Sequence, residues 1–194
     1  MTPEPLFTGP ELCKFEAHEV VALLKAREIS SVDLIDAALT RISQTGPLIN
    51  ATPTLCEARA RAVDLSSRDS TPDGWLAGLP ITIKDLNAVA DVRTTFGTKG
   101  LTDFIPQKND PLMDQLEQRR AVILGKTNTP EFGAGGNTFN EVFGQTRNPW
   151  NTALNPGGSS GGAAASLAAG EIWLSHGSDH GGSLRTPAAY CGIV

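Results

Sequence analysis

Apolar residues recur at helical spacing in the first third of the chain. The first predicted helix runs from Glu16 to Arg27, with an apolar face of Val20, Leu23 and Leu24. Ser30 and Ser31 are suited to cap a second helix, whose apolar face is Val32, Leu34, Ile35, Ala38, Leu39 and Ile42. An alanine- and arginine-rich stretch predicts a third helix from about Thr54 to Leu65. We therefore expect a helical segment over residues 1–70, joined by a loop over 66–74 to a larger body over residues 71–194.

The pattern changes in the middle of the chain. Leu79–Lys84 alternates and is rich in β-branched residues, which predicts a strand. A helix is predicted over Pro111–Arg120, with Pro111 in its first turn, and a short buried strand over Ala121–Gly125. Strand, helix and strand in this order indicate a parallel crossover and an α/β fold.

The last third is punctuated by glycine. The sequence predicts mostly loop over Gly125–Trp150 and a small-residue helix over Gly161–Ala169. It then predicts a strand over Glu171–Ser175 and a short helix or turn over Ser183–Tyr190. Because the final residues, Tyr190–Val194, are apolar and form no polar tail, we expect a truncated form or a fragment of a longer protein.

Composition narrows the class of protein. Of the 194 residues, 40% are hydrophobic and 19% charged, as in soluble globular proteins. The formal net charge is −5 and no basic run occurs, so we expect neither a nucleic acid nor an anionic membrane as partner. No stretch approaches the roughly 20 apolar residues of a membrane span, and the first residues lack the pattern of an export signal.

The cysteines and histidines indicate no disulfide framework and no metal site. Cys13, Cys56 and Cys191 are few, odd in number and far apart, which fits a reducing cytoplasm. None has a glycine-rich approach or a histidine nearby in sequence, so we interpret them as buried or incidental thiols. No cluster of His, Cys, Asp and Glu has the spacing of metal ligands.

Two glycine-serine runs and one lysine carry the candidate chemistry. The runs are Gly157–Gly162 (GGSSGG) and Gly177–Arg185 (GSDHGGSLR), and the lysine is Lys84, at the end of an apolar strand. Ser159 and Ser183 each follow two glycines, where the backbone can approach a ligand closely and its N–H groups can face an anion.

Other interpretations of these runs fit the sequence less well. A flexible linker would not lead directly into a helix at Gly161. A phosphate-binding P-loop needs a lysine after its last glycine, and Ala163 follows here. Two Gly-x-Ser-x-Gly matches, centred on Ser159 and Ser160, would suit the nucleophile elbow of an α/β-hydrolase, but Leu154–Pro156 before them is not a strand.

Lys84 and the two runs together resemble the amidase signature family, as do the phrases Gly125–Asn128 and Arg147–Trp150. The resemblance extends from about residue 10 to the end of the chain. It implies Ser183 as the acyl nucleophile, Ser159 as a bridging serine after a cis peptide bond, and Lys84 as the base. It further implies an oxyanion hole made by N–H groups of His180, Gly181, Gly182 and Ser183, with Ser160, Asp179 and Arg185 as supporting residues that fix the loops.

The implied chemistry is consistent with the residue types. A serine hydroxyl needs a neighbour that takes its proton, and lysine can do so when burial favours its neutral form. A hydroxyl such as that of Ser159 can relay the proton because it both donates and accepts. His180 departs from the family, which more often has threonine or an apolar residue there. Since its role in the loop is mainly through its backbone, we interpret the side chain as a packed or hydrogen-bonded histidine; the alternative is a side chain that lines the pocket and alters substrate preference or pH response.

The resemblance also sets the expected fold and partners. It implies an α/β/α fold around a mixed sheet, of which residues 71–194 would be the N-terminal part, and a hydrolase of a small-molecule amide without a cofactor, which we expect in the cytoplasm from the cysteines. Three functions stay open: a free-standing amidase, the amidase subunit of a tRNA-dependent amidotransferase, and a non-catalytic fragment. A homodimer of the full-length protein also stays open.

Overall fold

A four-stranded mixed sheet organises the chain. The computed structural model describes residues 9–63, 65 and 74–194. The strand order is β1 (Thr54–Leu55), β3 (Val122–Thr127), β2 (Pro80–Lys84) and β6 (Ser175–His176). β1 is antiparallel to β3, whereas β2 is parallel to both β3 and β6. The predicted α/β class with a mixed sheet is therefore confirmed.

The parallel crossover predicted in the middle of the chain is present. It runs from β2 through α4 (Pro111–Gln118) to β3, and Pro111 occupies the first turn of the helix. All residues of both strands are buried, as expected of parallel strands covered on both faces. The carboxyl ends of β2, β3 and β6 therefore lie along one edge of the sheet, where polar side chains of these strands can meet.

The two predicted N-terminal helices are present, and the second, for which only the start was predicted, runs seven residues beyond Ile42. A short 3₁₀ turn, η1 (Glu11–Lys14), precedes α1 (Ala17–Ala26), which ends at the left-handed residue Arg27. α2 (Ser31–Ile49) is capped by the preceding residue, Ser30, whose hydroxyl accepts a hydrogen bond from the Asp33 N–H. Asp33 in turn accepts from the Ser30 N–H, a reciprocal cap that satisfies two N–H groups at the helix end.

The third predicted helix was wrong at its start and too long. Thr54 and Leu55 form β1, and α3 covers only Glu57–Arg61. β1 can pair with β3 because Gly125 has no side chain: a Cβ there would lie 2.6 Å from the Thr54 carbonyl oxygen. The loop expected over residues 66–74 lies outside the described residues except for Gly74.

The strand predicted over Glu171–Ser175 was also wrong, since β6 comprises Ser175 and His176. Glu171 is fully buried and its carboxylate accepts hydrogen bonds from the hydroxyls of Thr45 and Thr52. These hydrogen bonds hold Glu171 against α2 and the residues that follow α2. The chain therefore enters the sheet only at Ser175, four residues later.

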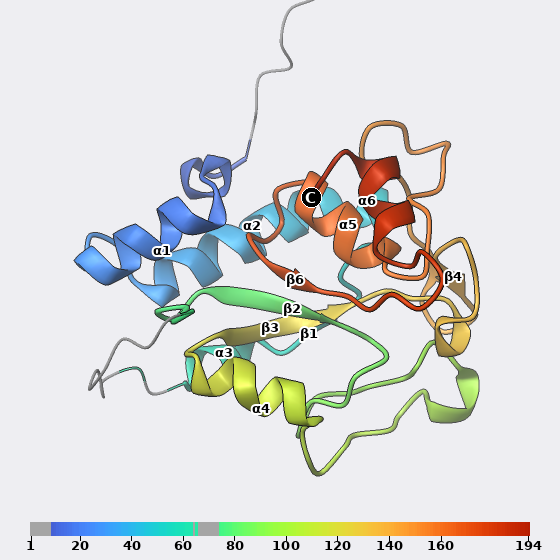
Figure 1. Cartoon of the computed structure of the whole chain (residues 1–194), viewed down its shortest axis with the longest axis horizontal. Coiled ribbons are helices and arrows are strands. Elements are labelled where there is room, and N and C mark those ends of the chain that lie inside the picture. Colours follow the sequence, from blue (N-terminus) through green and yellow to red (C-terminus); the bar gives the residue numbers. More distant parts are fainter. Residues whose placement is uncertain (1–8, 64, 66–73) are drawn as a thin grey trace, which may run out of the picture.

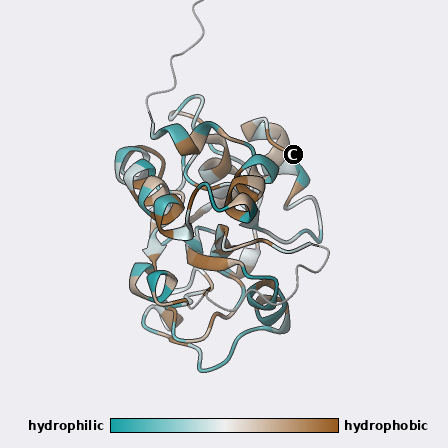
Figure 2. Ribbon diagram, turned by 90° about the vertical axis from the view of Figure 1, so that its left-hand side faces the viewer, coloured by the Kyte–Doolittle hydropathy of each residue, from teal (hydrophilic) through white to brown (hydrophobic). Residues whose placement is uncertain are grey.

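Helices cover both faces of the sheet. Figure 1 shows α2, α5 (Gly161–Ala168) and α6 (Arg185–Cys191) on one side and α3 and α4 on the other. Figure 2 shows hydrophobic segments, in brown, along the strands at the centre. One buried cluster includes Val20 and Leu34 of the N-terminal helices together with Ile83 and Ile123 of the strands. The N-terminal helices and the sheet therefore share a core.

The segment between β3 and α5 is mostly loop, as predicted. It contains a 3₁₀ turn, η3 (Glu131–Gly133), and a two-stranded ribbon of β4 (Phe139–Asn140) and β5 (Gly144–Gln145). A further 3₁₀ turn, η2 (Lys99–Leu101), lies between β2 and α4. Among the described residues, no helix is long and apolar enough to cross a membrane.

Candidate active site

Lys84 ends β2 with a fully buried side chain whose amine lies among serines. Its Nζ lies 2.7 Å from Ser159 Oγ and 2.8 Å from Ser160 Oγ. It also lies 3.1 Å from Ser178 Oγ and 3.5 Å from the Ser178 carbonyl oxygen. Burial lowers the pKa of Lys84 to about 8, while the charge of Asp179 acts in the opposite direction. The neutral amine is therefore accessible near neutral pH.

Ser159 and Ser160 immediately precede α5, and both are buried. The peptide bond between Gly158 and Ser159 is cis, as the resemblance implied. Gly158 packs against other backbone: a Cβ there would lie 2.8 Å from the Asn137 nitrogen and 2.9 Å from the Gly135 carbonyl oxygen. The absence of a side chain at residue 158 thus lets the serine turn sit beside Lys84.

The loop that carries Ser183 is held against the same serines. The backbone N–H of Ser160 donates to the Ser183 carbonyl oxygen at 3.1 Å, and Ser183 itself is half-buried. The structure therefore brings Lys84 and Ser159 into direct contact and places the Ser183 backbone next to Ser160. The structure gives no hydrogen bond between the Ser183 hydroxyl and Ser159 among the described residues, so the part of Ser183 in the centre stays a prediction.

Asp179 organises the Ser183 loop. Its carboxylate accepts hydrogen bonds from the N–H groups of Gly182, Leu184 and Arg185, at 2.7, 3.1 and 3.3 Å. It also forms a bidentate ion pair with the Arg185 guanidinium, at 3.0 Å for each nitrogen. These donors, that of Arg185 first, hold the pKa of Asp179 well below its usual range. Asp179 and Arg185 thus contact each other and fix the loop.

One member of the predicted oxyanion hole is engaged elsewhere. The Gly182 N–H donates to Asp179 Oδ1 at 2.7 Å, so in this arrangement it does not point at a free anion position. Gly182 instead supplies a backbone φ of +104°, in the region that favours glycine. This bond leaves the Gly182 N–H unsuited to its predicted part in the oxyanion hole, and the N–H groups of His180, Gly181 and Ser183 stay a prediction.

Two residues near Lys84 were not singled out from the sequence. Ser178 carries no sequence signal beyond its place in the second glycine-serine run, yet its hydroxyl and carbonyl both face the Lys84 amine. His176 lies on β6, and its Nδ1 is buried without a hydrogen-bond partner among the described residues. Burial first, then the charge of Lys84, lowers the pKa of His176.

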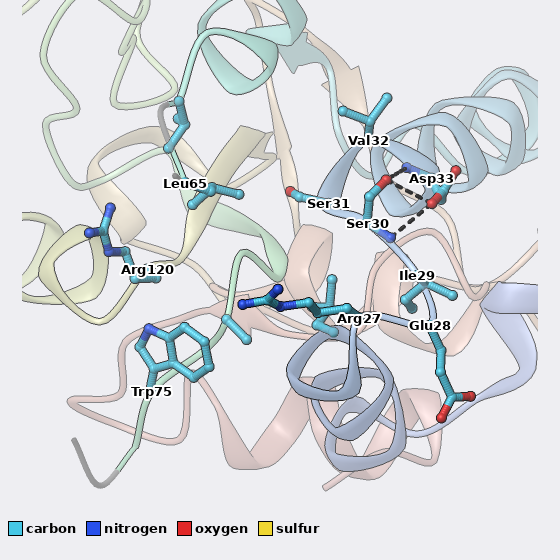
Figure 3. A pocket seen from close by; sticks show the side chains of 13 residues that line it. Arg27, Glu28, Ile29, Ser30, Ser31, Val32, Asp33, Leu65, Trp75 and Arg120 are labelled. Carbon is cyan, nitrogen blue, oxygen red and sulfur yellow. Dashed lines mark hydrogen bonds between the residues drawn. The ribbon is translucent and has the colours of Figure 1, made fainter. Parts of the chain in front are cut away.

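The positions of two cavities can be compared with that of the candidate centre. One, of about 340 Å³, is bordered by Ser160 and Arg185 and is otherwise mainly apolar, between α5 and α6. Another, of about 470 Å³, lies beside the capped start of α2 and is bordered by Arg27, Trp75 and Arg120 (Figure 3). None of the predicted site residues borders the second cavity, so it is separate from the candidate centre.

The described residues contain no group of three or more His, Cys, Asp and Glu that could hold a metal ion. The three cysteines are free, and burial raises the pKa of each thiol to about 11. Such thiols are poor nucleophiles near neutral pH because they are almost entirely protonated.

Known proteins resemble the chain over most of its length. A family model described as Amidase matches residues 33–194. The chain is 44% identical, over 95% of its length, to a Glutamyl-tRNA(Gln) amidotransferase subunit of Carboxydothermus hydrogenoformans, and it spans 39% of that protein. The corresponding protein of Dehalococcoides mccartyi is 42% identical over 95% of the chain, which spans 38% of it.

Two known structures extend the comparison to three dimensions. A 6-aminohexanoate cyclic dimer hydrolase, in complex with substrate, has a TM-score of 0.85 and 33% identity; the match covers 94% of the chain and 37% of that protein. A Glutamyl-tRNA(Gln) amidotransferase subunit of Thermotoga maritima has a TM-score of 0.75 and 30% identity, covering 93% and 37% of the two chains. The chain thus spans less than two-fifths of the length of each of these four relatives.

Proposed function

The chain belongs to the amidase signature family, and from this premise we propose that it cleaves a carboxylic amide through an acyl intermediate on Ser183. One observation carries the proposal: the buried Lys84 amine lies 2.7 Å from Ser159 Oγ. Ser159 belongs to a turn whose next residue, Ser160, donates its N–H to the Ser183 carbonyl oxygen. A base, a relay hydroxyl and a nucleophile are the parts that serine acyl chemistry needs.

In the proposed reaction the proton of Ser183 leaves through Ser159. Lys84, as the neutral amine, accepts the Ser159 hydroxyl proton, while Ser159 Oγ accepts the proton of Ser183. The Ser183 oxygen then bonds to the amide carbon. Collapse of the tetrahedral intermediate breaks the C–N bond, and the relay returns the proton to the departing nitrogen. A water molecule then gives its proton to the same relay and its oxygen bonds to the ester carbon; the bond from that carbon to the Ser183 oxygen breaks, and the relay returns the proton to Ser183.

The negative charge on the tetrahedral oxygen needs hydrogen-bond donors. We assign this role to the N–H groups of His180, Gly181 and Ser183. Gly181 suits a close approach of substrate, because a Cβ at its position would meet nothing within 4 Å. Loss of one such donor typically costs about 3–4 kcal/mol of barrier, so the Asp179–Arg185 pair that shapes the loop supports catalysis indirectly.

Labelling with a fluorophosphonate serine probe tests the proposal. We expect labelling of the chain, none of Ser183→Ala, and labelling of Lys84→Met slowed by about 10²- to 10⁴-fold, the usual worth of a general base. Ser43→Ala, on the exposed side of α2, is the matched serine control and should label at the original rate. Labelling that persists in Ser183→Ala would exclude the assigned nucleophile, and a chain that is never labelled would be the non-catalytic fragment.

The curated relatives favour a second, more specific function: the amidase subunit of a tRNA-dependent amidotransferase. In that role the chain would release ammonia from glutamine for transfer to glutamyl-tRNA. The net charge of −5 does not argue against such a complex, because another subunit can hold the tRNA. The chain spans only 38–39% of those two relatives, so both functions refer to the amide chemistry of this segment.

The two functions differ in their dependence on partners. Ammonia release from glutamine and from a simple aliphatic amide would be measured with the chain alone and with the other subunits of a bacterial Glu-tRNA(Gln) amidotransferase. Glutamine turnover that requires the other subunits supports the amidotransferase role. Turnover of the simple amide by the chain alone, unchanged by the subunits, supports a free-standing amidase instead.

A further inference from the structure

A second lysine is buried beside the candidate centre and has no part in the reaction proposed above. Lys126 lies in β3, next to β2, and its side chain is fully buried. Its Nζ donates to the Asn87 carbonyl oxygen at 2.7 Å and to Thr94 Oγ1 at 2.8 Å. It also lies 3.1 Å from Asp85 Oδ1. Two hydrogen-bond acceptors and one carboxylate in ion-pair contact thus surround this ammonium group.

Asp85 is the residue that directly follows Lys84, and it is equally buried. While Oδ1 faces Lys126, Oδ2 accepts hydrogen bonds from the Thr95 N–H at 3.0 Å and the Thr95 hydroxyl at 2.6 Å. Asn87, whose carbonyl oxygen accepts a hydrogen bond from Lys126, donates its own N–H to the Lys84 carbonyl oxygen at 3.2 Å. The contacts of Lys126 and Asp85 thus fix the turn that directly follows Lys84.

The same contacts continue to Ser159 through two loops. Thr95 Oγ1 accepts a hydrogen bond from the Gly97 N–H at 3.0 Å. The neighbouring Phe96 carbonyl accepts from the Phe132 N–H at 2.7 Å, and this holds the η3 loop. Gly133, next in that loop, abuts the centre: a Cβ on it would lie 3.5 Å from Ser159 Oγ and 2.5 Å from Leu86 Cδ1.

We propose that Lys126 and Asp85 are positioning residues for the amide chemistry: their ion pair fixes the turn after Lys84 and, through Thr95 and the η3 loop, the surroundings of Ser159. The catalytic part of this inference rests on the function proposed above. The ion pair and its contacts explain why a second lysine is kept in the core, where an unpaired charge would be costly.

The partners of the two lysines separate their roles. Lys126 has a carboxylate at 3.1 Å, whereas the hydrogen-bond partners of Lys84 are three serines. Burial lowers the pKa of Lys126, but the charge of Asp85 opposes that shift. Lys126 is therefore the lysine suited to stay an ammonium ion and hold structure, and Lys84 the one suited to lose its proton.

A double variant distinguishes a positioning role of Lys126 and Asp85 from an effect on folding stability alone. Lys126→Met leaves Asp85 as a buried unpaired charge, so this single variant should be strongly destabilised. Lys126→Met combined with Asp85→Asn removes both charges and should recover much of the unfolding midpoint. The contacts of the Lys126 amine to Asn87 and Thr94 stay lost in the double variant. Lys25→Met, on the exposed face of α1, is the matched lysine control.

Two readouts decide the outcome in the double variant. Fluorophosphonate labelling of Ser183 should be about ten- to a hundredfold slower, the effect of a misplacement near 1 Å, with the control unchanged. Amide hydrogen exchange should be about tenfold faster in segments 94–97 and 130–133, because local opening becomes easier, but unchanged in α1. Labelling and exchange that recover together with stability would overturn the proposal.

The exchange readout does not depend on activity. If the unmodified chain is not labelled, the proposed function fails, while faster exchange in those two segments would still support the clamp formed by Lys126 and Asp85. If the chain is labelled but neither readout changes in the double variant, the clamp is refuted and the proposed function stands.

Discussion

At the scale of single residues, Lys84 and Lys126 lie in neighbouring strands, both with fully buried side chains, and differ in what surrounds their amines. Hydroxyl groups can accept from or donate to an amine, so they tolerate both of its protonation states. A carboxylate favours the charged state. The chemical role of each lysine therefore follows from the side chains that the fold brings to it, and not from its position in a strand.

The protonation of Lys84 predicts the pH dependence of the proposed reaction. Because burial lowers its pKa to about 8 and the base is the neutral amine, labelling of Ser183 should be slow at low pH. It should rise with pH through a midpoint near 8 and then level off. The measurement is the fluorophosphonate labelling rate from about pH 6 to about pH 10, a range that ends near the ordinary pKa of lysine.

The control for this profile is Lys84→Met, whose slower labelling should show no rise with that midpoint. A rate that falls as the pH passes through 8 would contradict the neutral-amine base, since it would require the ammonium form.

The candidate catalytic residues could be predicted from the sequence, but not all their partners. Lys84, Ser159 and Ser183 belong to motifs whose order along the chain is diagnostic. In contrast, Ser178 and the engagement of the Gly182 N–H by Asp179 depend on the path of a short loop. That path is set by tertiary contacts, such as the bond from Ser160 N–H to the Ser183 carbonyl, which no local pattern encodes.

At the scale of elements, α5 directly follows the turn that carries Ser159 and Ser160. It packs closely against the backbone of neighbouring segments. A Cβ on Gly162 would lie 2.4 Å from the Asn128 nitrogen and 2.8 Å from the Ala51 carbonyl oxygen. Because the residues of α5 are small, this helix can approach the end of β3 closely. The predicted helix over Gly161–Ala169 was confirmed, with α5 ending at Ala168.

We predict that Gly162→Ala destabilises the chain although alanine is the better helix former. The helix propensity gain is up to about 1 kcal/mol, whereas forcing a methyl group against rigid backbone typically costs about 1–3 kcal/mol. The free energy of unfolding, from urea titration, should fall. Gly136→Ala is the matched control, since a Cβ at that residue would meet nothing within 4 Å; an equal effect of both substitutions would contradict the close seating of α5.

Short strands were the elements that the sequence predicted least well. β1 and β6 have two residues each, too few for an alternating pattern to show. β1 exists because Gly125 leaves room for the Thr54 carbonyl oxygen, and β6 starts late because Glu171 is bonded to Thr45 and Thr52. In both cases contacts far apart in sequence outweighed local preference.

At the scale of the whole molecule, the N-terminal helices and the sheet are joined by one buried cluster that contains Leu34 of α2 and Ile83 of β2. Trp173, which precedes β6, belongs to the same cluster and donates its indole N–H to the Leu12 carbonyl oxygen at 3.1 Å. A boundary near residue 70, as predicted from the sequence, would divide this cluster between two units. The shared core predicts instead that both parts unfold together.

Leu34→Ala tests this prediction because Leu34 is fully buried in the N-terminal part. Loss of a buried leucine typically costs about 2–5 kcal/mol. If the core is shared, far-UV circular dichroism, dominated by the helices, and tryptophan fluorescence should report one coincident transition that shifts as a whole. Leu48→Ala, in the same helix but 62% exposed, should change stability by no more than about 0.5 kcal/mol. Two separate transitions, of which Leu34→Ala moves only one, would show that the helical segment and the sheet fold independently.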